Sequence, residues 1–379
     1  MSDRKIKPVF ANVYWFPVAA FYAALILPWS VLGQLGWAGA PVGLRSSWGH
    51  GHEMLFGFAL AVVSGYLLGP RPRRNLLAML GLWLLARIAF LGWPTSLAAA
   101  LFDLGFVLAL AWQTVPSFLK TAKKWRNKSV GFILLGLLCS AAAFQFALRG
   151  DRWVPLPGTV LLEVVLLLSA LMFFMGGRLL APAIAGHMQD KGRKLLARVQ
   201  PNIEAAVLLL LAVLLLFNLV ALEWLRHIEG AVLLACAALA LLRMLRWQIW
   251  HCFDRADFVA LLCGYCWLII GWALVGCSLL GAALPLSAAF HAITVGALGT
   301  LTASIMLRTR MLRCLKVADA WPWAYLVAVP VSIAAVLRLA LGMLPVDGAL
   351  LLAAGLWSLG FLVLFFLLLR MARLEKGRP

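Results

Sequence analysis

Long apolar runs separated by short polar linkers extend along the whole chain. A membrane-spanning helix needs about 20 apolar residues, and twelve runs of this kind can be marked in the 379 residues. They lie near 13–34, 50–69, 75–93, 96–119, 129–148, 158–180, 203–224, 229–248, 258–281, 286–307, 323–344 and 347–370. No linker could hold a soluble domain. The pattern therefore predicts an all-α polytopic membrane protein of about twelve transmembrane helices, forming one membrane-embedded domain over 1–379.

Composition and charge agree with that prediction. The chain is 64% apolar and only 12% charged, with a net charge of +19, whereas soluble domains carry roughly 25% charged residues. Of the 33 Lys and Arg, 26 fall in the termini and alternate linkers on one side, including 191–198 and 243–255, and four fall on the other. The positive-inside rule then predicts cytoplasmic termini in a bacterial inner membrane. We expect this charge to face membrane lipid headgroups and not nucleic acid.

Ionisable side chains inside the apolar runs gather in one layer. At a rise of about 1.5 Å per residue, six of them lie within roughly 10 Å of the outer membrane boundary. Because such groups are costly in hydrocarbon, they mark a candidate site. The six residues are His52, Arg87, Asp103, Glu163, His291 and Arg338.

Histidine and arginine in this layer suit a haem. His52 and His291, on different helices at similar depth, could supply axial ligands to its iron. Arg87 and Arg338 could pair with the propionates. The competing interpretation is structural: packing histidines with hydrogen bonds, and arginines paired with Asp103 or Glu163. Spacing alone leaves both interpretations open.

The cysteine pattern predicts no structural disulfide, because no cysteine lies in an outer linker. Cys263 and Cys266 form a C-x-x-C pair within one apolar run and share a helix face. Two thiolates so placed could hold a soft metal. Packing of small apolar side chains between helices is the favoured interpretation.

Short motifs also recur around the two histidines. His52-x4-Gly57 parallels His291-x4-Gly296, and similar strings around Arg87 and Arg338 follow on the next helices. The first four helices thus echo the last four. We hypothesise three four-helix repeats, 1–128, 129–256 and 257–379, which keep one orientation, unlike the inverted repeats of many transporters.

The string HGHEMLFGFALAVVSGYLL at 50–68 resembles the signature of the NnrS family of membrane proteins. LWLLARIAF at 82–90, FFMGGRLLAP at 173–182, GYCWLIIGWAL at 264–274 and AFHAITVGALGTLTASIMLRTRM at 289–311 agree with it. The resemblance implies a protein of the nitric oxide response that carries haem and copper. Matched residue by residue, it marks a metal site at His50, His52, Glu53, Met54 and His291. The chain departs from the family pattern at 69–74 and 311–314, both cytoplasmic in the expected topology.

The helix layout is also similar to that of the main subunit of haem-copper oxidases. Histidines lie at the outer ends of helices two and ten, but helices six and seven contain none, so the copper centre of those enzymes has no counterpart there. We expect a haem near the outer face, held by His52 and His291, with copper near His50, Glu53 or Met54. His50 and His52 could share one metal, or either could be the haem ligand.

Two classes of function follow from these residues. A bis-histidine haem favours electron transfer from an unidentified donor, while an open axial position would admit nitric oxide, so an oxidoreductase is one expectation. The alternative is a small-solute transporter, or a non-catalytic membrane protein, whose polar outer layer lines a cavity.

Overall fold

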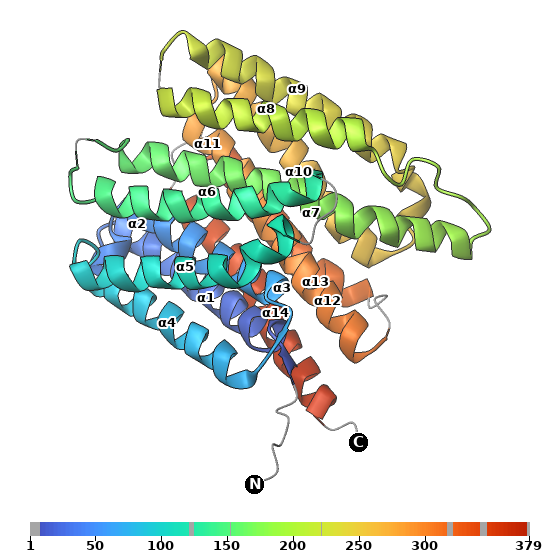
Figure 1. The fold of residues 1–379 in the computed structure, drawn as a ribbon, viewed down its shortest axis with the longest axis horizontal. Coiled ribbons are helices and arrows are strands. Elements are labelled where there is room, and N and C mark those ends of the chain that lie inside the picture. The colour runs from blue at the N-terminus through green and yellow to red at the C-terminus, as the bar shows by residue number, and fades with distance from the viewer. Residues whose placement is uncertain are drawn as a thin grey trace. The chain divides into compact units, whose positions relative to one another are not determined.

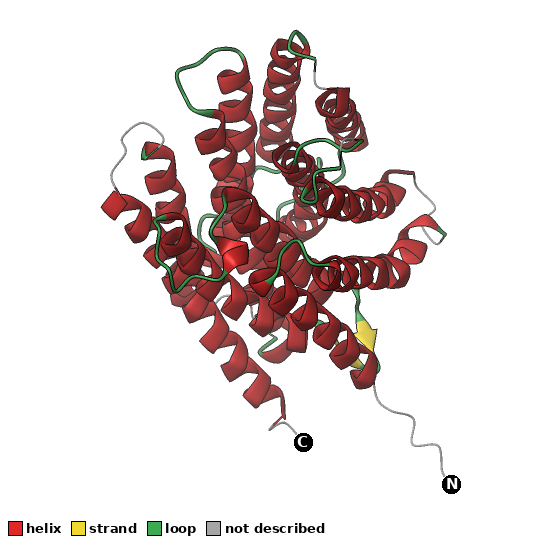
Figure 2. Cartoon of the chain, turned by 90° about the vertical axis from the view of Figure 1, so that its left-hand side faces the viewer, coloured by secondary structure: helices red, strands yellow, loops and turns green. Residues whose placement is uncertain are grey.

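The structure is a computed structural model that describes residues 8–120, 125–151, 153–220, 222–316, 321–341 and 347–376. These residues are almost wholly helical, and their one small sheet pairs β1 (Val9–Phe10) antiparallel to β2 (Pro70–Arg71) (Figure 2). The basic segment 1–7, residues 121–124 of the basic linker and the last three residues lie outside the described part.

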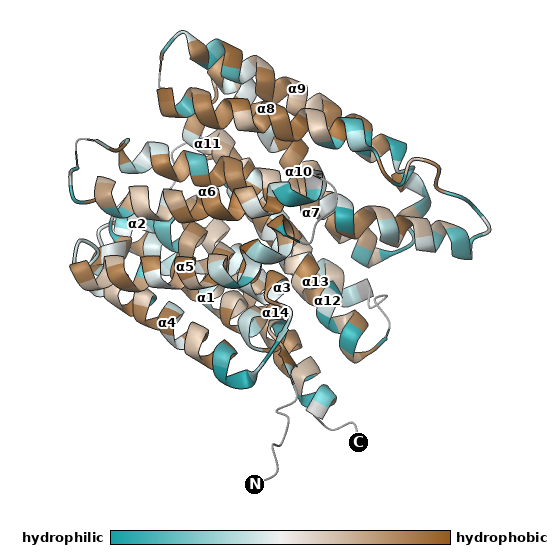
Figure 3. Ribbon diagram, in the orientation of Figure 1, coloured by the Kyte–Doolittle hydropathy of each residue, from teal (hydrophilic) through white to brown (hydrophobic). Residues whose placement is uncertain are grey.

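The expected fold class is confirmed. In the described part of the chain, eleven helices are long and apolar enough to cross a membrane. The remaining expected run, 50–69, forms a continuous helical stretch of α2 (Ser47–His52), a π-helix (Glu53–Ala59) and α3 (Leu60–Leu67). Because this stretch changes helix type, neither α-helix in it is long enough to span a membrane alone. Apolar residues dominate the helices, and hydrophilic ones lie mostly toward helix ends (Figure 3).

The chain divides into two compact units. The first, up to Val164 together with Leu364–Pro379, contains α2, the π-helix and α3. Its α5 packs against both α4 and α6, and its α1 packs on α3 and the π-helix. The other elements of this unit are α1 (Asn12–Gln34), the 3-10 helix Val42–Leu44, α4 (Arg73–Gly92), α5 (Leu97–Leu119), α6 (Trp125–Ala147), the start of α7 (Pro157–Asp190) and the end of α14 (Asp347–Lys376).

The second unit, Val165–Val363, is organised around α10, which packs against α9, α12, α13 and a second π-helix. Here α8 and α9 lie side by side (Figure 1). Besides the rest of α7 and α14, its elements are α8 (Pro201–Val220), α9 (Leu225–Arg246), the 3-10 helix Ile249–Cys252, α10 (Ala256–Leu279), α11 (Leu286–His291), the π-helix Ala292–Gly299, α12 (Thr300–Cys314) and α13 (Trp321–Ala340). The hypothesis of three four-helix repeats stays a prediction.

Small residues allow the helices around α10 to approach closely. A Cβ atom on Gly230 of α9 would lie 2.8 Å from the carbonyl oxygen of Gly276 of α10, and the reverse distance is the same. On another side of α10, alanines pack against α13, namely Ala256 and Ala260 with Ala324 and Ala328. Larger side chains at the two glycines would therefore push α9 and α10 apart.

Each unit contains one π-helix, and each π-helix begins directly after one of the two histidines, His52 and His291. The π-helix is rare and is found frequently at functional sites. The sequence motif shared by these two positions thus corresponds to a shared local backbone.

Candidate functional site

A closed cluster of charged side chains surrounds His52 inside the first unit. The ring Nδ1 lies 2.8 Å from Oε1 of Glu53, and Nε2 lies 2.6 Å from Oδ2 of Asp103. Arg87 donates to both carboxylates, from Nη1 to Oε1 of Glu53 at 2.7 Å and from Nη2 to Oδ1 of Asp103. None of the four side chains belongs to a residue more than 2% exposed. We call these four residues the His52 cluster.

Two neutral side chains donate further hydrogen bonds to the carboxyl groups of the His52 cluster, while the buried Nε of Arg87 has no partner. The Tyr22 hydroxyl donates to Oε2 of Glu53, and Nε2 of Gln145 donates to Oδ2 of Asp103 at 2.7 Å. The imidazole is stacked on Phe90, with ring centroids 3.7 Å apart, and on Phe144 at 4.9 Å. Hydrogen bonds and stacking together fix the orientation of the ring.

The donors and acceptors of the His52 cluster determine its proton count. An ionised carboxylate only accepts hydrogen bonds, and both ring nitrogens face carboxylate oxygens. Either the imidazole therefore carries two N–H groups, or one carboxyl group is protonated. With Arg87 included, both arrangements have zero net charge. Zero net charge lowers the free-energy cost of burying these groups away from water.

A glycine of the π-helix makes room for this cluster. A Cβ atom on Gly57 would lie 2.9 Å from Cε1 of Tyr22 and 3.2 Å from Nη1 of Arg87. The Gly57 carbonyl also accepts a hydrogen bond of 3.1 Å from Nε1 of Trp83. The glycine in the motif His52-x4-Gly57 thus admits the side chains that hold Glu53.

The His52 cluster does not fit a haem in this arrangement. Both nitrogens of His52 face carboxylates and its ring is stacked, so no nitrogen is presented to an iron. Arg87 is occupied by Glu53 and Asp103, as the structural interpretation of the sequence expects. His50 is partly exposed on α2, and Met54 is buried at 8% exposure. In the described residues, no three His, Cys, Asp or Glu side chains gather as metal ligands.

His291 has a different setting in the second unit. It is partly exposed, and its Nδ1 lies 2.5 Å from the carbonyl oxygen of Ser287 one turn earlier. A histidine whose Nδ1 donates to a backbone carbonyl is oriented as metal-ligating histidines commonly are, with Nε2 as the donor atom to the metal. This geometry fits one axial ligand of a haem.

The arginine of this unit also differs from Arg87. Arg338 is partly buried on α13, the helix against which α11 packs. It forms no hydrogen bond or ion pair with another residue among those the structure describes. A guanidinium at this depth calls for an anionic partner, and a carboxylate such as a haem propionate meets that need.

A second buried ion pair, absent from the sequence predictions, lies in the second unit. Nη2 of Arg243 donates to Oε1 of Glu204, and Nη1 donates to the Phe173 carbonyl at 3.0 Å. The guanidinium lies over the rings of Phe173 and Trp247, 4.5 and 5.0 Å from their centroids. The sequence count assigns Arg243 to a linker, but the structure places it at 2% exposure in the last turn of α9.

The cysteine pair is engaged in packing contacts. The Cys263 sulfur lies 3.4 Å from Oγ of Ser332 on α13, while the Cys266 sulfur lies 3.7 Å from Sδ of Met244 on α9. The two thiols therefore contact different helices. These contacts agree with the packing interpretation.

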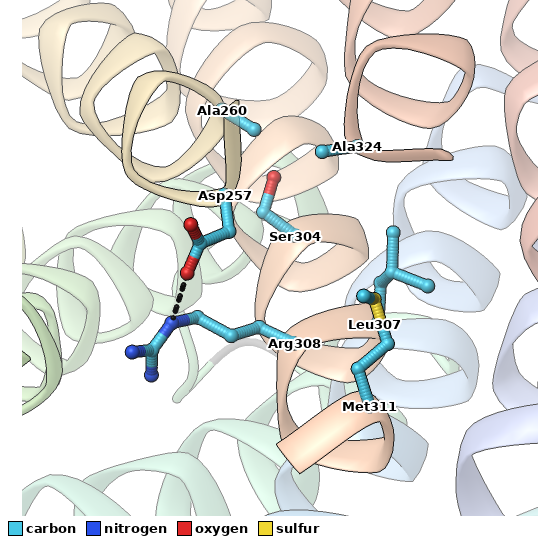
Figure 4. Close-up of a pocket in the computed structure, with 7 residues that line it drawn as sticks. All are labelled: Asp257, Ala260, Ser304, Leu307, Arg308, Met311 and Ala324. Atoms are coloured by element: carbon cyan, nitrogen blue, oxygen red, sulfur yellow. Dashed lines mark hydrogen bonds and ion pairs between the residues drawn. The ribbon is translucent and has the colours of Figure 1, made fainter. Parts of the chain in front are cut away.

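A small pocket lies where α10 begins, next to α12 and α13 (Figure 4). Nε of Arg308 donates to Oδ2 of Asp257 at 2.9 Å, and Arg255 donates to both oxygens of the same carboxylate. Two guanidinium groups thus share one carboxylate. The pocket is lined by Asp257, Ala260, Ser304, Leu307, Arg308, Met311 and Ala324.

Two members of the polar surroundings of His52 are missing from the sequence predictions. Gln145 lies three residues before the expected outer end of its run, so the same depth arithmetic would put it roughly 5 Å deep, in the layer of Asp103. Tyr22 lies in the middle of its run, where depth gives no such signal. Its contact with Glu53 depends on how α1 packs on the π-helix.

Long apolar helices enclosing buried charged groups define a multi-pass membrane protein with a buried polar centre. The family model described as NnrS protein matches residues 14–373. The chain therefore belongs to the NnrS family. A comparison with curated proteins finds no match.

Proposed function

We propose that this NnrS family member binds haem near the outer face of a bacterial inner membrane and acts in the nitric oxide response. The main supporting observation is the setting of His291, which directly precedes a π-helix and whose Nδ1 donates to the Ser287 carbonyl. Membership of the family over 14–373 supports the same proposal, because the sequence resemblance implies haem.

The residues of the second unit have distinct proposed roles. His291 would hold the haem iron through Nε2, and Arg338 would balance a propionate from the adjacent α13. A bound haem would supply electron transfer or a binding position for nitric oxide. These side chains would set the position and charge of the group.

The His52 cluster has a supporting role in this proposal. Its ion pairs tie together α2, the π-helix, α4 and α5. We therefore propose that His52 is a positioning residue and not an axial ligand. Copper remains a second proposed cofactor on the sequence resemblance, with His50 as its candidate ligand.

The topology is part of the proposal. The excess of Lys and Arg in alternate linkers supports cytoplasmic termini. With that orientation, the beginnings of α2 and α11, and hence His291, lie toward the outer face.

The optical spectrum of the purified full-length protein tests the cofactor. After expression with ample haem supply, we expect a Soret band and a pyridine haemochrome signal near one haem per chain. Arg338→Gln should weaken haem retention, while Arg226→Gln, the same charge change at an exposed position, should not. A wild-type protein without a Soret band would contradict the proposal and favour the transporter class. Metal analysis of wild type and His50→Ala tests copper separately.

A further inference from the structure

A basic surface lies at the end of the second unit where α7 and α9 end and α10 begins. Lys191 and Arg193 follow α7, and Trp250 and His251 lie in the 3-10 helix between α9 and α10. The Lys191 ammonium contacts the His251 carbonyl at 3.1 Å. We call Lys191, Arg193, Trp250 and His251 the Arg193 cluster.

Hydrogen-bond donors exceed acceptors at the His251 ring. Nη1 of Arg193 lies 2.5 Å from Nδ1 and 3.1 Å from Nε2, and the Trp250 indole N–H lies 3.2 Å from Nε2. Arginine and tryptophan only donate, and a neutral imidazole has one acceptor nitrogen and one N–H. At least one N–H at this ring therefore meets no acceptor within the Arg193 cluster.

The charge of the Arg193 cluster is also uncompensated. Lys191 forms an ion pair of 2.8 Å with Asp254, but Arg193 pairs with no carboxylate among the described residues. Desolvation and the neighbouring cations Arg193 and Lys191 lower the pKa of His251, so its ring is neutral near pH 7 and accepts from arginine. One full positive charge and a spare donor thus remain, which an anionic oxygen would satisfy.

Apolar side chains place this surface at the edge of the membrane. Trp250 is 51% exposed and Phe253 is 59% exposed, next to the ends of the spanning helices α9 and α10. Exposed aromatic residues at the ends of spanning helices are typical of the headgroup level of a bilayer. A phosphate at this depth is most simply the headgroup of a membrane lipid.

We propose that the Arg193 cluster binds the phosphate of an anionic phospholipid, with Trp250 and Phe253 against its glycerol and upper acyl chains. Arg193 and the Trp250 N–H would donate to phosphate oxygens, and Lys191 would add charge from the adjacent turn. This proposal is independent of any haem.

Thermal unfolding of the full-length protein in neutral detergent tests the site by titration with dioleoylphosphatidylglycerol. We expect this lipid to raise the melting temperature, and dioleoylphosphatidylcholine to have little effect. Arg193→Gln should need at least about tenfold more phosphatidylglycerol for the half-maximal shift, equivalent to about 1.4 kcal/mol. Arg193→Lys should recover part of the difference.

Arg226→Gln is the matched control, because it removes one positive charge from an exposed residue in the first turn of α9. If Arg193→Gln does not fold, Trp250→Phe takes its place as the test variant. This substitution keeps an aromatic ring and removes the indole N–H donor, and it should weaken lipid binding about threefold. If Arg193→Gln and Arg226→Gln need the same phosphatidylglycerol concentration for the half-maximal shift, the proposal is overturned. An equal shift with inorganic phosphate at the same concentration would also overturn it, in favour of a free anion.

Discussion

His52 and His291 stand in the same sequence motif and before the same type of helix, yet their surroundings differ. His52 is 1% exposed, faces two carboxylates and is stacked on phenylalanines. His291 is partly exposed and is held by a backbone carbonyl. A repeated motif thus fixes a backbone form, while neighbouring helices decide the chemistry of the histidine.

The glycines of the two motifs explain part of that difference. Gly57 makes room for Tyr22 and Arg87, which bring polar atoms to the first π-helix. Gly296 makes room instead for the indole of Trp267, whose Cδ2 would lie 2.6 Å from an added Cβ atom. The same residue type therefore admits a polar network in one unit and an apolar ring in the other.

Replacing Arg87 should have the largest effect on this comparison. Arg87→Met removes the guanidinium that the buried side chains of Glu53 and Asp103 share, so we expect the free energy of unfolding to fall by about 3–5 kcal/mol. The matched variant Arg338→Met, on a partly exposed residue, should cost less than about 1 kcal/mol. Chemical unfolding in one detergent measures both. Equal losses would show that Arg87 is not the centre of the His52 cluster.

Breaking the buried ion pair of the second unit should have the second-largest effect on the free energy of unfolding. Arg243→Met leaves one buried carboxylate, Glu204, so we expect a loss of about 3 kcal/mol, smaller than for Arg87→Met. The same unfolding measurement applies. The double variant Arg243→Met/Glu204→Leu should regain part of that loss, because no unpaired charge remains. A larger loss in the double variant than in Arg243→Met would contradict this explanation.

Loss of one neutral hydrogen-bond donor should lower the free energy of unfolding less than loss of a buried arginine. Tyr22→Phe removes one hydrogen bond to the Glu53 carboxylate, and we expect a loss of about 1–2 kcal/mol. Tyr14→Phe on the same helix is the control, because the Tyr14 hydroxyl forms no hydrogen bond with another described residue. If both variants unfold at the same denaturant concentration, the Tyr22 contact adds nothing to stability.

The smallest effect concerns the exposed ion pair near the Arg193 cluster. Hydrogen bonds from Lys191, and secondarily from His187, lower the pKa of Asp254 to about 2. A carboxylate with a lowered pKa stabilises the fold above its unfolded pKa of about 4, and this stability is lost as the pH falls toward 2. Asp254 is 49% exposed, so screening should keep the effect of Asp254→Asn below about 1 kcal/mol. The melting temperatures of wild type and Asp254→Asn should converge as the pH falls toward 2. A difference that stays constant with pH would show that the ionised Asp254 carboxylate does not stabilise the fold.

Hydropathy predicted the spanning runs because it depends on local composition. Depth arithmetic also placed Arg87 and Asp103 in one layer, and the structure pairs them. The choice between a ligand and a packed histidine at His52 could not be predicted, because it depends on Tyr22, Phe90 and Phe144 from three other helices. The π-helices were also not predicted. The motif His-x4-Gly stands at both of them, but the sequence alone does not show that the helix there forms i→i+5 hydrogen bonds.

Haem content per folded chain in two histidine variants distinguishes a ligand role of His291 from a ligand role of His52. His291→Ala and His52→Asn would be purified in the same detergent, and the pyridine haemochrome signal of the monodisperse fraction would be divided by protein concentration. We predict that His291→Ala loses most of its haem, while folded His52→Asn keeps a haem content near that of wild type. Full haem in His291→Ala, with loss of haem from folded His52→Asn, would show that His52 and not His291 holds the haem.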